Sequence, residues 1–192
     1  GAADAYDAAV DTPLDRGTAL STRLNNEVFI KREDLQEVFS FKIRGAYNKM
    51  SSLNAKQRSE GVLCASAGNH AQGLAQAAKL MGVRATIVMP VTTPEIKVAS
   101  VRARGAKVVL FGDTFNDALS HALALEKQRN LHFIHPFDDP EIIAGQGTVA
   151  MEIVHQHSAK IDAVFVPVGG GELIAGIAAY IKTVRPETQV IG

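Results

Sequence analysis

Lys42 raises the first chemical question in this sequence, because it lies between Phe41 and Ile43, shortly after Phe39, in the apolar stretch VFSFKIRGA. Ser40 could cap a helix running through FKIRGAYNKMSSL, which would put Lys42 in its first turn. There the positive end of the helix dipole and desolvation by Phe39 and Phe41 both disfavour the ammonium form. Such an amine suits Schiff-base chemistry or general-base work. Taken alone, however, the stretch is explained better by an ordinary lysine that extends past the rings to water.

A glycine-rich stretch, VGGGELIAG, follows the apolar run IDAVFVPV and precedes a helical pattern. Its three consecutive glycines give a backbone that can wrap around a phosphate group. Gly169, Gly171 and Gly176 do not have the spacing of a dinucleotide-binding fingerprint, and no G-x-x-x-x-G-K-[ST] motif is present. A tight turn with close helix packing would explain one or two glycines more easily than three. A phosphate site is therefore the favoured interpretation.

The stretch SAGNH, residues 66–70, lies between the apolar run GVLCAS and a helical pattern. Free backbone N–H groups and the dipole at a helix N-terminus favour an anion, so a carboxylate or phosphate would fit there. Capping of the helix by Ser66 and Asn69 explains the same residues equally well.

Taken together, an activated lysine, a phosphate-binding loop and an anion-binding loop suit pyridoxal phosphate acting on an amino acid. Lys42 would hold the aldehyde, the glycines the phosphate, and residues 66–70 the substrate carboxylate. The histidine pairs at 132 and 135 and at 155 and 157 have no Cys or carboxylate cluster beside them, so we expect no metal site.

The elements that must position these groups alternate regularly from residue 61 onward. Short apolar runs such as RATIVMP and AKVVLFG are followed by helical patterns, and this alternation predicts parallel βαβ units in a doubly wound α/β fold. Thr93 and Pro94 are expected at the N-cap and first position of one helix. KRED, residues 31–34, is interpreted as a charged strand end before a turn. Ligands of such folds bind at the carboxyl ends of the strands, where both candidate loops lie.

Composition narrows the possible partners. The 192 residues are 46% hydrophobic and 21% charged, which is typical of a globular protein with a real core. Twenty basic residues balance twenty acidic ones, so we expect a small-molecule partner and neither nucleic acid nor a membrane. A lone cysteine, Cys64, excludes an intrachain disulfide framework and fits a reducing compartment. The N-terminal stretch lacks the pattern of a secretory signal.

The ordered series KRED, SFKIRGA, SAGNHAQG, IVMP, GQGT and VPVGGG resembles the threonine dehydratases (threonine deaminases) among the fold-type II pyridoxal-phosphate enzymes. The resemblance covers almost the whole chain. It implies the two-lobe, tryptophan-synthase-beta-like architecture, with Lys42 as the Schiff-base lysine and with Phe41 and Asn69 against the pyridine ring. The phosphate would bind at Gly169, Gly170, Gly171, Glu172 and Leu173. The substrate carboxylate would bind at Ser66, Ala67, Gly68, Asn69 and His70, with Gln146 nearby.

The resemblance also implies a reaction: dehydration and deamination of L-threonine, and of L-serine, to 2-oxobutanoate or pyruvate and ammonia, a first step toward isoleucine. Serine racemases of this fold carry a serine where Ala67 stands, so Ala67 favours elimination over racemisation. Glu172 replaces a fourth glycine of the family pattern. A carboxylate about 4 Å from a phosphate charge would cost on the order of 4 kcal/mol, less if it turned to solvent. The alternatives are therefore a serine racemase-like enzyme and a non-catalytic fragment or degenerate paralogue without turnover.

By the same resemblance, residues 40–148 form the small lobe, and residues 1–39 and 149–192 form part of the larger, cofactor-binding lobe. The rest of that lobe would lie beyond Gly192, so the chain is expected to be truncated. We expect a homo-oligomer, or association with the missing C-terminal segment. The expected location is the cytoplasm, or an organellar matrix or plastid after removal of a transit peptide.

Overall fold

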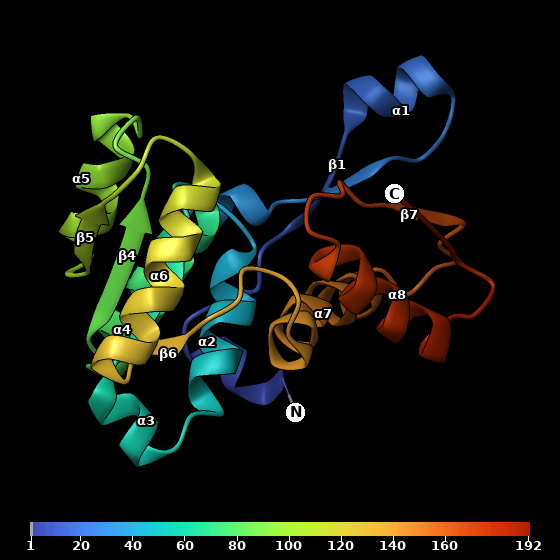
Figure 1. Ribbon diagram of the computed structural model, residues 1–192. Helices are drawn as coiled ribbons and strands as arrows, with labels where there is room; N and C mark the ends of the chain where they lie inside the picture. The colour runs from blue at the N-terminus through green and yellow to red at the C-terminus, as the bar shows by residue number, and fades with distance from the viewer. Residues whose placement is uncertain (1) are drawn as a thin grey trace.

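Four parallel strands form the largest sheet of the computed structural model, which describes residues 2–192 and, from Ala5 onward, their side chains. The strand order is β5-β4-β3-β6, with β3 (Val62–Ala65), β4 (Ala85–Met89), β5 (Lys107–Leu110) and β6 (His132–Phe133). The helices of this part are α2 (Lys42–Ser51), α3 (Ala55–Glu60), α4 (Asn69–Met81), α5 (Glu95–Ala103) and α6 (Phe115–Arg129). Figure 1 shows β4 between α6 and the helices behind it.

Alternating side chains of β3 and β4 pack against helices on the two faces of this sheet. Leu63 and Val88 are buried in one cluster with apolar side chains of α6. Cys64 and Ile87 lie in a second cluster with side chains of α2, α4 and α5. Successive side chains of a strand point to opposite faces, so both faces are covered. The doubly wound α/β fold predicted from the alternating pattern is therefore confirmed.

The helix boundaries follow local sequence signals in most places. Helix α6 begins with a capping box in which Thr114 and Asp117 satisfy each other's backbone N–H groups. The expected N-cap Thr93 is wrong, because α5 begins at Glu95 and Pro94 takes the N-cap position. Thr93 instead donates its backbone N–H to Pro90 in a turn.

A second group of elements surrounds α7 (Pro140–Gln156) and α8 (Glu172–Val184), which lie side by side (Figure 1). Strands β7 (Ala163–Phe165) and β8 (Gln189–Ile191) pair in parallel. The N-terminal part contributes η1 (Ala2–Asp7), β1 (Leu14–Arg16), α1 (Thr18–Leu24), β2 (Phe29–Lys31) and η2 (Glu33–Leu35), with β1 and β2 antiparallel. The expected lobe boundary after residue 148 falls inside α7, which continues unbroken across it. None of the helices in residues 2–192 is long and apolar enough to cross a membrane.

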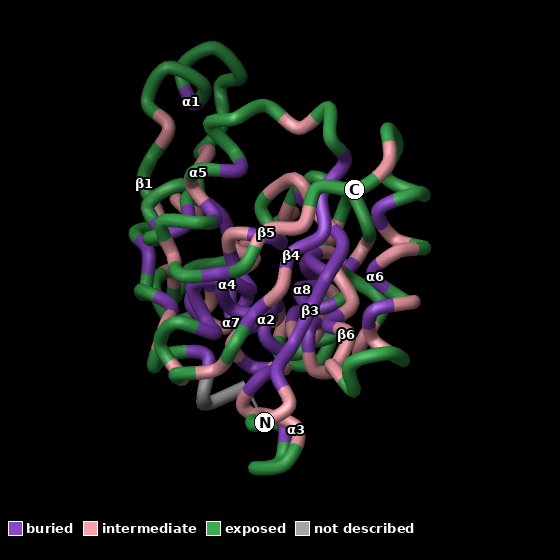
Figure 2. The backbone as a smooth tube through the Cα atoms, turned by 60° about the vertical axis from the view of Figure 1, so that its left-hand side comes forward, coloured by how far each residue is buried: buried purple, intermediate pink, exposed green. Residues whose placement is uncertain are grey.

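Helix α2 connects the two groups, because it packs against both α4 and α7. The burial view shows α2 and β3 among the most enclosed segments (Figure 2). The crossing with α7 is close: a Cβ atom added at Gly145 would lie 2.6 Å from the carbonyl oxygen of Arg44 and 2.6 Å from Cα of Gly45. Only glycine allows the two backbones to approach so nearly.

Replacing Gly145 by alanine is therefore expected to lower the free energy of unfolding by about 1–3 kcal/mol, because a backbone cannot yield as a flexible side chain can. Denaturant unfolding measures the change. The matched control is Gly17→Ala, where the new Cβ would meet its nearest neighbour, Cδ1 of Ile30, at an ordinary 3.4 Å. Equal unfolding midpoints for the two variants would contradict the close helix crossing.

Candidate active site

Lys42 is the first residue of α2, so the prediction that it lies in the first helical turn is confirmed. Its Nζ donates a hydrogen bond to the carbonyl oxygen of Pro136 at 2.9 Å and forms an ion pair with the Glu172 carboxylate. The amine lies 5.6 Å from the centroid of the Phe41 ring. The Lys42 side chain is only 16% exposed, so it does not extend into water as an ordinary surface lysine would.

The expected capping role of Ser40 is wrong. Phe41 holds the N-cap position without a side-chain hydrogen bond, and Ser40 Oγ is buried with no hydrogen-bond partner. Phe39, which precedes Ser40, has φ +58°, an unusual backbone conformation for a residue with a bulky side chain. Its side chain is 72% exposed. The turn that delivers Lys42 is thus held by tertiary packing rather than by local capping.

The glycine loop, residues 169–173, follows β7 and includes the first two residues of α8, and its Glu172 contacts the Lys42 amine. Gly170 is needed for packing, because a Cβ atom there would lie 2.4 Å from Cγ of Phe137. Gly169 and Gly171 have open space instead, with no atom within 4 Å of an added Cβ. Gly171 caps α8 with φ +94°, a conformation that favours glycine. Close packing therefore explains one of the three glycines, and the other two border open space.

The second loop, residues 66–70, joins β3 to α4. Gly68 occupies the N-cap position, and no side chain caps the helix. Ser66 Oγ instead accepts a hydrogen bond from the Gly68 backbone N–H at 3.2 Å. Ser66 and Asn69 therefore do not cap the helix, and the alternative interpretation of this loop is excluded. The Asn69 side chain is exposed, and a Cβ at Gly68 would meet no atom within 4 Å.

His70 behaves differently from the rest of this loop. Its ring is buried, and Nε2 lies 3.1 Å from the carbonyl oxygen of Ile134. A carbonyl oxygen can only accept, so Nε2 carries the ring hydrogen and donates a hydrogen bond to Ile134. Burial lowers the pKa of His70 to about 4, against the opposing effect of that hydrogen bond, and the positive charges of Lys42 and His135 lower it further. The imidazole is therefore neutral near pH 7. Its expected contact with a substrate carboxylate stays a prediction.

Gln146 lies apart from both loops. Its side chain is fully buried between α2 and α7, and Oε1 accepts a hydrogen bond from the Gly45 backbone N–H at 3.0 Å. Its Nε2 is buried without a hydrogen-bond partner. In this conformation Gln146 holds the two helices together and exposes no atom to a ligand, and its expected place near the substrate stays a prediction.

A buried charge network, missed in the sequence, anchors the helix that carries Lys42. Arg44 is fully buried, and its guanidinium donates two hydrogen bonds to Glu33, at 2.8 and 2.7 Å. It also donates to Glu152 at 2.8 Å and to Thr148 at 3.0 Å. Lys31 forms an ion pair with the same Glu152 carboxylate. The stretch KRED is therefore more than a charged strand end, since two of its side chains belong to this network.

The network favours the charged forms of Arg44 and Glu152. Burial opposes the charge on Arg44, but hydrogen bonds to Glu33 and Glu152 outweigh burial and raise its pKa above the usual value. Burial likewise opposes the charge on Glu152, but hydrogen bonds from Arg44 and Lys31 outweigh it, so its pKa lies below the usual value. The charges of these groups compensate one another inside the protein.

Comparison with known proteins shows the family to which the chain belongs. Residues 6–192 match the family model described as "Pyridoxal-phosphate dependent enzyme". The biosynthetic L-threonine dehydratase of Burkholderia multivorans is 57% identical over 190 residues, which are 97% of this chain and 38% of that protein. The chain belongs to the family of pyridoxal-phosphate dependent enzymes. The mitochondrial threonine dehydratase of Saccharomyces cerevisiae is a further relative, 55% identical over 97% of this chain and 33% of its own length.

Solved structures of the pyridoxal-phosphate dependent family share the fold. The processed form of threonine deaminase isoform 2 from Solanum lycopersicum matches with a TM-score of 0.96 and 53% identity, over 98% of this chain and 52% of that one. Maize serine racemase matches with a TM-score of 0.94 and 34% identity, over 98% of this chain and 57% of that one. The chain spans about a third of the length of the curated relatives named above.

Most of the site fits the family's cofactor, an aldehyde that carries a phosphate group. The open positions at Gly169 and Gly171 leave room beside the N-terminus of α8, whose dipole favours an anion. The Lys42 amine lies within reach of that helix, as its contact with Glu172 shows. Glu172 is the exception, because its carboxylate has the same sign of charge as the phosphate.

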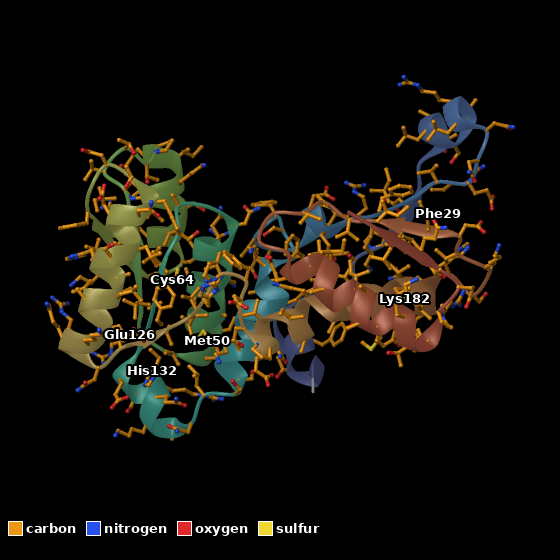
Figure 3. The ribbon with its side chains drawn as sticks, turned by 45° about the vertical axis from the view of Figure 1, so that its right-hand side comes forward. Phe29, Met50, Cys64, Glu126, His132 and Lys182 are labelled. Carbon is orange, nitrogen blue, oxygen red and sulfur yellow. The ribbon has the colours of Figure 1, made fainter. Side chains whose placement is uncertain are left out.

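The remaining candidates lie elsewhere. His132 binds Glu60 through Nε2 at 2.8 Å, and Figure 3 shows it on the side of the molecule away from Lys182 of α8. In the described part of the chain, no group of three or more His, Cys, Asp or Glu residues could hold a metal ion. Burial raises the pKa of the Cys64 thiol, which lies inside the core.

Proposed function

We propose that this chain carries the lysine, phosphate-binding loop and substrate-carboxylate loop of a pyridoxal-phosphate-dependent threonine dehydratase. The reaction is dehydration and deamination of L-threonine, and of L-serine, to 2-oxobutanoate or pyruvate and ammonia. The observation that carries this proposal is the contact between Lys42 and Glu172, which brings the amine to the glycine loop across 130 residues of sequence. The names and high identity of the relatives support the same substrate.

Each loop has a separate task in this proposal. Pyridoxal phosphate, when bound, supplies an electron-withdrawing ring that takes up the electron pair left at Cα. Lys42 would hold the cofactor aldehyde, and its amine, when free, would take the proton from the substrate Cα. The N–H groups of residues 169–173 would hold the phosphate, and those of residues 66–70 would orient the substrate carboxylate. Phe41 and Asn69 would lie beside the ring.

Ala67 decides the outcome after proton removal. The side chain of alanine has no proton to donate, so this position could not return a proton to the opposite face of the substrate Cα. Loss of the β-hydroxyl is then favoured over racemisation. This argument ranks a serine racemase-like activity second, although maize serine racemase shares the fold.

The proposal is tested by titrating the purified protein with pyridoxal phosphate and recording the visible absorbance band of the lysine-bound cofactor. We expect a saturable band that disappears in Lys42→Ala. The matched control is Lys49→Ala, which removes another lysine of α2, one paired with Asp139 at 2.7 Å, and should keep the band. Absence of the band at saturating cofactor, or its persistence in Lys42→Ala, would overturn the proposal. Turnover is followed by the formation of 2-oxobutanoate from L-threonine.

One observation favours a second candidate, a protein that binds a small anion or aldehyde without turnover. Glu172 already neutralises Lys42, so the amine has a partner before any ligand arrives. A saturable absorbance band without release of 2-oxobutanoate from L-threonine, or of pyruvate from L-serine, would favour this candidate.

We also propose that residues 40–148 act as the small lobe and that residues 1–39 and 149–192 belong to the cofactor-binding lobe. Support comes from α2, which packs against elements of both groups. Homo-oligomeric assembly, or association with a further C-terminal segment, and a cytoplasmic or organellar location complete the proposal. The relatives include bacterial, chloroplastic and mitochondrial proteins.

A further inference from the structure

Glu172 occupies the position where an anion is most favoured in this site. It is the first residue of α8 and only 3% exposed, so its carboxylate lies in the field of the helix N-terminus. The same carboxylate forms the ion pair with Lys42. One side chain therefore puts a negative charge both at the helix end, where the phosphate would bind, and beside the amine with which the aldehyde would react.

This pairing affects the two functional groups of the cofactor differently. The aldehyde needs an unpaired Lys42 amine, because an ammonium paired with a carboxylate is not a nucleophile. The phosphate needs the N-terminus of α8, where the buried Glu172 charge repels it. An aldehyde without a phosphate group must also displace the carboxylate from Lys42, but it meets no repulsion at the helix end.

We infer that Glu172 is a specificity-determining residue: it acts as a built-in counter-ion of Lys42 and reduces the preference of the site for phosphorylated over unphosphorylated aldehydes. This inference rests on the proposed function, since it assumes that Lys42 reacts with an aldehyde. In that reaction the carbonyl carbon forms a C=N bond with the Lys42 nitrogen, the carbonyl oxygen leaves as water, and no oxidant or reductant is needed.

The first test compares the Kd of pyridoxal phosphate with the Kd of pyridoxal, which lacks the phosphate, by absorbance titration. Glu172→Gln keeps the shape of the side chain and removes its charge, while Glu172→Gly removes the side chain. We expect both to tighten pyridoxal phosphate about tenfold or more and pyridoxal much less. Glu172→Asp keeps the charge and should keep the Kd ratio of the unaltered protein. An unchanged ratio in Glu172→Gln and Glu172→Gly would overturn the inference.

The second test needs no cofactor. The ligand-free protein is treated with a small uncharged acylating reagent, and modification of each lysine is followed by mass spectrometry. Removing the counter-ion should speed acylation of Lys42 several-fold in Glu172→Gln, while Lys49 in the same helix serves as the internal reference. Equal Lys42 rates in the two proteins would contradict the counter-ion role, and circular dichroism checks that the variant is folded.

The outcomes separate this inference from the proposed function. If neither aldehyde gives an absorbance band with any variant, the proposed function fails and the inference fails with it. If both aldehydes give the band with one Kd ratio throughout the series, the proposed function stands and Glu172 does not set the preference. If the Kd ratio shifts in favour of pyridoxal phosphate in Glu172→Gln and Glu172→Gly but not in Glu172→Asp, the result supports both the proposed function and the inference about Glu172.

Discussion

Replacing Arg44 by alanine is expected to lower the free energy of unfolding by about 3–5 kcal/mol, because the change removes the ion-pair partner of Glu33 and leaves the buried Glu152 carboxylate with Lys31 alone. Arg44 is fully buried, Glu152 is 3% exposed, and Arg44 is the residue that joins Glu33 to Glu152. Domains are stable by only about 5–15 kcal/mol, so this single change would remove a large share of the total. Denaturant unfolding of the purified variant measures the loss.

The matched control is an exposed ion pair of the same chemistry. Lys160 and Asp162 have side chains 72% and 79% exposed, so Lys160→Ala should lower the free energy of unfolding far less than Arg44→Ala does. Arg44→Lys keeps the charge but loses the paired hydrogen bonds, and its cost should fall between the two. Similar losses for Arg44→Ala and Lys160→Ala would show that the buried network does not stabilise the fold as inferred.

Stability should fall as the pH is lowered from about 6.5 toward 4, because His70 takes up a proton in the unfolded chain before it does so in the fold. Burial, together with the positive charges of Lys42 and His135, lowers the folded pKa of His70 to about 4. The unfolded value is about 6.5. Between these values the unfolded chain binds more protons, so the loss accumulates to about 3 kcal/mol and then stops.

The pH effect is isolated by comparing slopes. Unfolding is measured at several pH values between 7 and 4 for the unaltered protein and for His70→Gln, which keeps a hydrogen-bond donor near Ile134 but does not titrate. The His70→Gln protein should lose distinctly less stability over this window. The control is His155→Gln, at an exposed ring, which should follow the unaltered protein. Parallel curves for all three proteins would refute the neutral, buried state of His70.

The four-stranded sheet could be predicted because its signals are local. Short apolar runs between glycines and helical patterns mark β3 to β6, and their alternating burial follows from strand geometry. Lys42 could be placed in a first helical turn for the same reason. The caps were less predictable: Ser40 and Thr93 are good capping residues by type, but the chain direction set by tertiary packing placed Phe41 and Pro94 at the N-caps.

The interactions of the candidate site were harder to predict, because they join distant segments. Neither VFSFKIRGA nor VGGGELIAG indicates by itself that Lys42 and Glu172 form an ion pair. The charge of Glu172 raised the question, but the sequence left open whether its side chain turned to solvent. The role of Arg44 was missed for the same reason, since its carboxylate partners lie 11 and 108 residues away. The spacing of Thr148 and Glu152 on one face of α7 was the available signal.

Helix α2 carries a consequence for the order in which this protein folds. Its functional amine and its anchoring guanidinium both find partners far along the chain, Lys42 at Glu172 and Arg44 at Glu152. Contacts of such large sequence separation form slowly, because long loops must close before the contacts can form. Until α7 and α8 pack against α2, Lys42 has no Glu172 and Arg44 no Glu152 beside it. The site around Lys42 is therefore complete only after these distant segments have come together.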